Sequence, residues 1–237
     1  MILKLAYIGL SLLMIIIVLA IGFKTINKTF TDKTVAGNLK MKLIFGLLLW
    51  QLYIFIIASS GVLESYELPP RFPLFLIIPA FIFTGIFIYK NRNSVWIQNI
   101  NPKHLIYIQS FRIIVETIFV HSLAEGILHK NVTIEGYNMD MIFGFTALII
   151  GYLAFNKVTK SAVIIWNYLG IAVLASVIFV FMSSIYFPEI YDSSTPLIPM
   201  KSVMYPYILV AAFLMPLAVF IHVLSIVQLK KQNESHL

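Results

Sequence analysis

The chain has 237 residues, of which 60% are hydrophobic and 11% are charged, and its mean hydropathy is +0.92. Soluble domains are about 45–50% apolar and about 25% charged, so this composition excludes a soluble fold and predicts an integral membrane protein. The formal net charge of +7 does not indicate nucleic-acid binding, because the basic residues lie between apolar runs and do not cluster on one surface. Cysteine is absent, which excludes disulfides, thiolate nucleophiles and cysteine-ligated metals.

Seven apolar stretches approach or exceed the ~20 residues that a membrane-spanning helix needs. They predict an all-α fold, a bundle of seven transmembrane helices in a single domain over residues 1–237. The third and fifth stretches are short for a span, so their ends are expected to extend into the flanking turns. The expected spans are residues 2–23, 43–62, 73–89, 105–128, 139–155, 162–187 and 205–229.

The first stretch is predicted to be a true membrane helix and not a signal peptide. Its apolar run is longer than the ~7–15 residues of a signal core, and no small-residue cleavage site follows it. The flank from Lys24 to Lys42 is strongly basic, which holds that flank in the cytoplasm.

The basic residues of alternate loops predict the orientation of the chain. One set of loops carries twelve of them: Lys24, Lys28, Lys33, Lys40, Lys42, Lys90, Arg92, Lys103, Lys157, Lys160, Lys230 and Lys231. The other set carries only four: Lys4, Arg71, Lys130 and Lys201. The N-terminus is therefore expected outside and the C-terminus in the cytoplasm. The abundance of Ile, Lys, Asn and Phe points to an AT-rich bacterial genome, and hence to the cytoplasmic (inner) membrane of a bacterium.

Two pairs of stretches share short patterns. Residues 50–53 (WQLY) in the second resemble residues 166–169 (WNYL) in the sixth, and Pro73 and Pro206 open the third and the seventh. These similarities fit a 3+1+3 parallel repeat around the fourth helix. Chance similarity between apolar helices is the alternative explanation.

The fourth stretch carries ionisable residues, which cost about 2.5–3.5 kcal/mol each at the bilayer centre. Gln109, Arg112 and Glu116 share one helix face, and the last two are i, i+4 neighbours that can form an ion pair within the helix. This inner cluster predicts either a substrate- or proton-binding site or a set of structural contacts between helices. Polar residues at comparable depth on other helices are expected to complete it: Gln51, Asn167 and His222.

A second, outer cluster is expected at the far end of the fourth helix. His121, Glu125 and His129 are spaced i, i+4 and i+8, and imidazole and carboxylate one turn apart suit zinc. They lie near the solvated interface, where charged helix ends are ordinary, so no metal is predicted and these three are only metal candidates. The following turn adds further polar residues to the outer cluster: Glu135, Asn138 and Asp140.

Several functions are excluded by what the spans lack. Covalent retinal binding needs a lysine inside the last helix, and no lysine lies deep in any span. The chain has no phosphate-binding glycine loop and no arginine ladder of a voltage sensor. No cofactor and no nucleic-acid partner is predicted. The expected partners are the lipid bilayer and a small-molecule ligand, and the sequence does not specify an oligomeric state.

Four segments carry a resemblance: residues 109–112 (QSFR) with Glu116, 135–140 (EGYNMD), 166–170 (WNYLG) and 222–225 (HVLS). Together they resemble an uncharacterised family of bacterial seven-span integral membrane proteins, from about the second helix to the end of the chain. The resemblance implies the seven-span fold and no particular activity. The family pattern has an arginine where this chain has Tyr137, which argues against an anion-binding role for the outer turn.

Three function classes stay open. Transport of a small solute, or proton-coupled transport through the inner cluster, is preferred because a buried Arg112–Glu116 pair surrounded by amides suits a central site. The alternatives are a seven-helix sensor or assembly partner without catalysis, and an intramembrane enzyme. That enzyme would use His121, Glu125 and Asp140 at the outer mouth, and it is the least favoured class.

Overall fold

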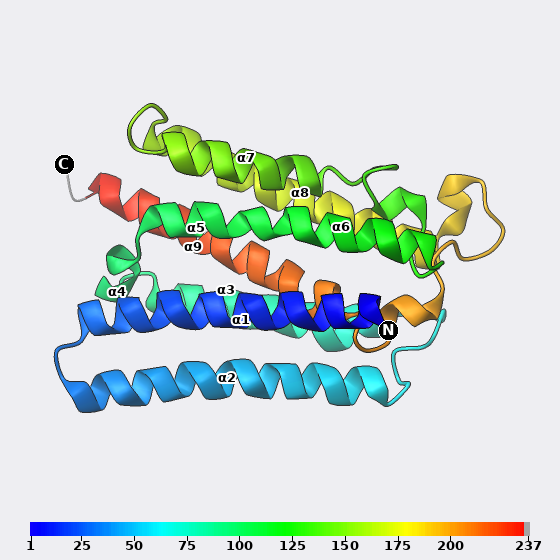
Figure 1. Ribbon diagram of the computed structural model, residues 1–237, viewed down its shortest axis with the longest axis horizontal. Coiled ribbons are helices and arrows are strands. Elements are labelled where there is room, and N and C mark those ends of the chain that lie inside the picture. The colour runs from blue at the N-terminus through cyan, green and yellow to red at the C-terminus, as the bar shows by residue number, and fades with distance from the viewer. Residues whose placement is uncertain (235–237) are drawn as a thin grey trace.

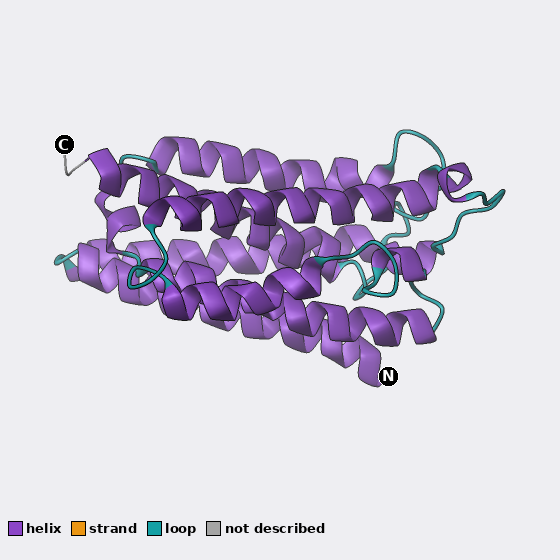
Figure 2. Cartoon of the chain, turned by 90° about the horizontal axis from the view of Figure 1, so that it is seen from above, coloured by secondary structure: helices purple, strands orange, loops and turns teal. Residues whose placement is uncertain are grey.

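Long helices run side by side along one axis of the computed structural model, which describes residues 1–234 (Figure 1). The domain expected over residues 1–237 includes residues 235–237, which lie outside the described part. The chain is 77% helical and residues 1–234 contain no strand, so the all-α expectation is confirmed. The loops gather at the two ends of the bundle (Figure 2), and the start of α1 and the end of α9 lie toward opposite ends (Figure 1).

Six helical segments in the described chain are long and apolar enough to cross a membrane. These are α1 (Ile2–Thr29), α2 (Lys33–Ser59), η1 with α3 (Pro73–Ile77 and Ile78–Asn91), α5 with η2 and α6 (Pro102–Tyr107, Ile108–Ser110 and Phe111–Ala124), α8 (Lys160–Tyr186), and η6 with α9 (Val210–Leu214 and Met215–Glu234). The shorter helices are α4 (Val95–Asn99), η3 (Lys130–Val132), α7 (Asp140–Leu153), η4 (Pro188–Tyr191) and η5 (Met200–Val203). Helix α9 and the α5–α6 segment are the most buried, and α2 is the least.

The ends of α1 and α2 differ from the apolar stretches that predicted them. Only residues 30–32 separate the two helices, where a loop over residues 24–42 was expected. The Asp32 side chain caps α2, because its Oδ1 accepts hydrogen bonds from the backbone N–H groups of Thr34 (2.7 Å) and Val35 (3.3 Å). Hydropathy marks only the part of a helix that lies in lipid, whereas capping and backbone hydrogen bonds set where it ends.

The count of seven membrane-length helices is not confirmed, because the fifth expected span is short. Helix α7 has 14 residues, or about 21 Å at ~1.5 Å per residue, against a hydrocarbon thickness of about 30 Å. Residues 125–139, which precede it, fold back along α6 after a turn at Gly126, whose φ is 64°. The N–H of Ile134 in this segment donates to Glu116, about two turns before α6 ends. Irregular backbone at such depth is tolerated where protein buries it, as at Asn131 and Thr133.

Small residues allow α7 to pack closely against the α5–α6 segment. A Cβ atom added at Gly144 would lie 3.0 Å from Ile113 Cγ1 and 3.1 Å from Ile113 N, and one at Gly151 would lie 2.7 Å from the Tyr107 ring. Ala147, between the two glycines, is fully buried. This spacing of small residues is typical of close helix contacts in membranes, where packing drives association.

The expected internal repeat has no support in the structure. The Trp50 indole donates to the carbonyl of Ala212 in η6 (3.1 Å), whereas the Trp166 indole donates to Thr146 Oγ1 on the preceding helix α7 (2.9 Å). The two tryptophans that suggested the duplication therefore hold their helices to unrelated partners.

We expect Gly144→Leu to lower stability by about 1–3 kcal/mol, the usual cost of overpacking, because the new side chain meets the backbone of α6. Gly85→Leu is the matched control, since nothing lies within 4 Å of a Cβ atom at the exposed Gly85 in α3. Thermal unfolding of the two variants in detergent measures the difference. Equal stability of both variants would contradict the close α6–α7 packing.

Candidate functional site

The buried guanidinium of Arg112, on α6, lies at the centre of the polar interior. It is 1% exposed, and its Nε donates to Asp140 Oδ1 at 2.8 Å while its Nη2 contacts the same oxygen. Asp140 is the first residue of α7, whose start lies beside α6 because residues 125–139 fold back. The prediction of an ion pair between Arg112 and Glu116 is therefore wrong. The partner of Arg112 is Asp140 on another helix, and Glu116 has hydrogen-bond partners of its own.

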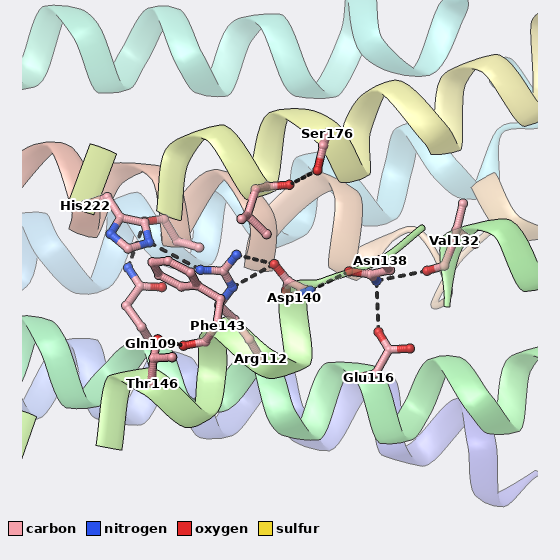
Figure 3. A network of polar contacts seen from close by, with 12 residues as sticks. Gln109, Arg112, Glu116, Val132, Asn138, Asp140, Phe143, Thr146, Ser176 and His222 are labelled. Carbon is pink, nitrogen blue, oxygen red and sulfur yellow. Dashed lines mark hydrogen bonds and ion pairs between the residues drawn. The ribbon is translucent and has the colours of Figure 1, made fainter. Parts of the chain in front are cut away.

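Glu116 is buried and holds the segment that leads into α7. It accepts hydrogen bonds from the Ile134 N–H and, at 2.9 Å, from Asn138 Nδ2. The same Nδ2 donates to the Val132 carbonyl (2.9 Å), and Asn138 Oδ1 accepts from the Asp140 N–H (2.8 Å). Asn138 thus connects the two carboxyl-bearing residues, as Figure 3 shows.

On its other side, Arg112 connects to two more helices. Its Nη1 lies 3.4 Å from His222 Nε2 on α9, and His222 Nδ1 lies 2.8 Å from Asn167 Oδ1 on α8. Asn167 Nδ2 in turn donates to Ser225 Oγ at 3.1 Å and to the Val163 carbonyl at 2.8 Å. Because a guanidinium can only donate, these contacts fit a neutral His222 that carries its proton on Nδ1.

Aromatic rings enclose the guanidinium and the imidazole. The guanidinium carbon of Arg112 lies 4.6 Å from the centre of the Phe143 ring, which stacks on Trp166 at 4.8 Å. His222 meets these two rings edge-on, at 5.7 and 5.4 Å. Cation–π contacts of this kind are stronger when water is excluded, so the rings both shield and stabilise the charge. Gly170 on α8 leaves room for the imidazole, which a Cβ atom there would meet.

These contacts connect seven residues into a buried polar chain: Glu116, Asn138, Asp140, Arg112, His222, Asn167 and Ser225. Figure 3 shows its labelled members, from Glu116 to His222, following one another along the direction of the helices. One guanidinium and two carboxyl groups lie in it. Because His222 is neutral in these contacts, the set is electrically neutral only when one carboxyl group holds a proton. This makes it a candidate site for proton uptake and release.

Two residues of the expected inner cluster lie outside the buried polar chain. Gln109 is fully buried, and its Nε2 donates to the Ala218 carbonyl at 3.0 Å, while its Oε1 has no partner among the described residues. Gln51 is half-buried on α2, and its side chain forms no hydrogen bond with any described residue of the protein. Both amides therefore contact the backbone or remain unpaired, and only Asn167 and His222 join Arg112 and Glu116.

The expected outer cluster divides. Asn138 and Asp140 belong to the buried polar chain, whereas Glu125 and Glu135 are exposed. His121 is also exposed, and its Nδ1 lies 2.8 Å from the Thr117 carbonyl of its own helix. Within residues 1–234, no group of three or more His, Cys, Asp and Glu residues is placed to hold a metal ion. The outer-face enzyme site, which needs His121, Glu125 and Asp140 together, is not assembled.

Three members of the site were not expected from the sequence. Phe143 follows Asp140 by three residues and Ser225 follows His222 by three, so each lies on the same face of its helix as an expected polar residue. That spacing was the available signal. Trp166 precedes Asn167 and supplies the second ring of the enclosure.

No protein-family model, curated protein or solved structure matches the chain. The resemblance to a family of bacterial seven-span proteins therefore stays a prediction.

We expect Asp140→Ala to lower stability by about 3–5 kcal/mol, because it leaves the Arg112 guanidinium buried without a counter-charge. Glu67→Gln is the control. It removes the charge from an exposed Arg71–Glu67 pair (3.1 Å), a kind of pair that contributes about 0–1 kcal/mol. Urea unfolding in mild detergent compares the two.

The double variant Arg112→Met, Asp140→Leu should recover part of the loss, since it removes both charges together. Similar losses for Asp140→Ala and Glu67→Gln would show that Arg112 and Asp140 do not form the buried pair.

Proposed function

We propose that the chain is a multi-pass protein of a bacterial inner membrane, with its N-terminus outside and its C-terminus in the cytoplasm. In this proposal α7 crosses the membrane together with the folded-back residues 125–139, which gives seven crossings. The supporting observations are that the start of α1 and the end of α9 lie toward opposite ends of the bundle (Figure 1) and that the basic residues concentrate in one set of loops.

Because the chain lacks cysteine, single-cysteine variants can test this topology directly. We expect Tyr137→Cys and Lys157→Cys, placed before and after α7, to react with a membrane-impermeant maleimide from opposite sides of sealed cells. Tyr137→Cys should react in intact cells, and Lys157→Cys only after permeabilisation. Reaction of both variants from one side would contradict a crossing by α7.

We further propose that the protein performs proton-coupled transport of a small solute, with Glu116 as the group that gains and loses the proton. The observation that carries this proposal is the charge count of the buried polar chain, which is neutral only when one of its two carboxyl groups holds a proton. Asp140 is engaged with Arg112 through two nitrogens, whereas Glu116 accepts only from an amide and a backbone N–H. Glu116 is therefore the carboxyl group that is free to change its protonation state.

The hydrogen bonds of Glu116 connect that proton to the segment that leads into α7. A carboxylate accepts both the Ile134 N–H and the Asn138 amide, while a protonated carboxyl has one fewer acceptor and gains a donor. Proton uptake thus weakens the attachment of residues 125–139 to α6. Asn138 passes any displacement to Asp140, and so to the start of α7. A change of proton occupancy then alters the packing of α7, which is the mechanical step that alternating access requires.

We expect Glu116→Gln to abolish proton-coupled charge movement in proteoliposomes challenged with pH jumps and pooled metabolites. The amide retains the size of the side chain but does not titrate. Glu125→Gln is the matched control, because Glu125 ends the same helix, is exposed and makes no ion pair in the described structure. Wild type and Glu125→Gln should give the same current.

Tracer uptake of the same metabolites detects transport that moves no net charge. If the wild type shows no current and no pH-dependent uptake, the transport proposal is overturned and the sensor or assembly-partner class is favoured. Full activity in Glu116→Gln would leave transport standing and remove Glu116 as its proton site.

A further inference from the structure

A cleft of about 400 Å³ lies beside the segment that Glu116 holds, outside the buried polar chain. One wall comes from residues 129–137, between α6 and α7, and the other from residues 190–197, after α8. A volume of this size accommodates a small metabolite. Its principal polar and aromatic residues are His129, Lys130, Asn131, Tyr137, Tyr191 and Asp192.

The two walls carry one charge each, and the charges are of opposite sign. Lys130 lies in the first wall and Asp192 in the second, and both side chains are exposed. Neither forms an ion pair within the described part of the chain, where the two ion pairs are Arg71–Glu67 and Arg112–Asp140. The cleft therefore offers a cation and an anion that do not neutralise each other directly.

His129 adds no charge to the cleft at neutral pH. Its Nδ1 accepts a hydrogen bond from the Asn131 N–H at 3.3 Å, which fits the neutral ring. The charges of the cleft sum to zero, with the positive and negative groups on different walls.

Asn131 contributes an unused hydrogen-bond donor. The residue is 6% exposed, and its Nδ2 has no partner among the described residues. A buried donor without a partner costs about 1–3 kcal/mol. A turn of the Asn131 amide toward the cleft would let a ligand oxygen satisfy it. The Tyr137 and Tyr191 rings contact each other, with centres 6.0 Å apart and planes tilted by 33°, so they join the two walls and give a surface for an apolar group.

We propose that this cleft binds a small zwitterion of the α-amino-acid class, with the ligand carboxylate at Lys130 and Asn131 and the ligand ammonium at Asp192. Separated opposite charges match a zwitterion better than they match a simple anion, cation or neutral solute. That such a ligand is the transported solute rests on the proposed function, but its binding to the cleft does not.

The cleft and Glu116 share one segment of chain. Asn131 and Tyr137 line the cleft, while Ile134 and Asn138 bind Glu116. The segment is internally tied, since the Tyr137 N–H donates to the Asn131 carbonyl at 2.9 Å. Gly136 permits this fold, because a Cβ atom there would lie 2.6 Å from the Asn131 Cα. Ligand binding on one side of the segment is thereby connected to the carboxyl group on the other.

Isothermal titration of the full chain in detergent tests the proposal, with individual L-amino acids as probes. We expect saturable binding of at least one amino acid. Analogues with the same side chain and only one charge, such as isocaproate and isoamylamine for leucine, should bind at least about tenfold more weakly. The proposal is overturned if no amino acid shows saturable binding. It is also overturned if the singly charged analogues bind as tightly as the amino acid.

Lys130→Gln and Asp192→Asn should each weaken the binding about tenfold or more, because each removes a charge-assisted contact. Lys201→Gln and Glu189→Gln are matched controls, as both residues are outside the cleft, in η5 and η4, and should leave binding unchanged. Lys130→Arg and Asp192→Glu keep the charges and should retain most of the affinity. Unchanged binding in both neutralised variants would overturn the assignment.

Glu116→Gln separates this proposal from the proposed function. The variant should still bind the amino acid in detergent while it loses proton-coupled uptake in proteoliposomes. If only the transport proposal is wrong, the wild type still binds the amino acid. If the cleft proposal is wrong, the wild type binds no amino acid, even if it transports another solute.

Discussion

The structure depends on burying one guanidinium. Transfer of Arg112 and Asp140 out of water costs several kcal/mol per ion, and their attraction offsets this cost only with good geometry and further hydrogen bonds. Asp140 and Phe143 of α7 and His222 of α9 contact the guanidinium, which α6 carries. Trp166 of α8 stacks on Phe143 behind them. The pair therefore fixes how these segments pack, and it explains why α7 begins at mid-depth and not at the end of the bundle.

A short α7 creates a second problem, which Glu116 and Asn138 solve. Residues 125–139 are largely irregular and lie partly inside the bundle, where unpaired backbone groups are costly. Glu116 accepts the Ile134 N–H, and Asn138 pairs with both the Asp140 N–H and the Val132 carbonyl. The Ile127 N–H donates to the Ser122 carbonyl at 2.8 Å. Polar side chains here replace the hydrogen bonds that a regular helix would have made within itself. The same groups serve folding and the proposed proton chemistry.

Sequence reasoning predicted the helices well and the contacts between them poorly. Hydropathy located each apolar stretch, because burial in lipid requires an apolar side chain at nearly every position. Arg112 and Glu116 were correctly placed on one helix, but spacing within a helix cannot reveal a partner such as Asp140, 28 residues away. Asp140 was assigned to the outer end because the turn after the fourth helix was expected to stay there, whereas residues 125–139 fold back along α6. The cleft was not predicted, since Lys130 and Asp192 belong to loops that only the tertiary fold brings together.

Thermodynamic linkage constrains how the two sites can act. Residues 129–138 contribute Asn131 and Tyr137 to the cleft and Ile134 and Asn138 to Glu116, so one arrangement of the segment must serve both. If a proton on Glu116 changes that arrangement, the affinity of the cleft for its ligand changes by some factor. Occupancy of the cleft then changes the affinity of Glu116 for its proton by the same factor, because coupling between binding sites is reciprocal. If the segment had only one arrangement, the proton and the ligand of the cleft would bind independently, and the two sites would not be coupled. Coupling of the two sites therefore requires that residues 125–139 take a second arrangement when Glu116 gains a proton.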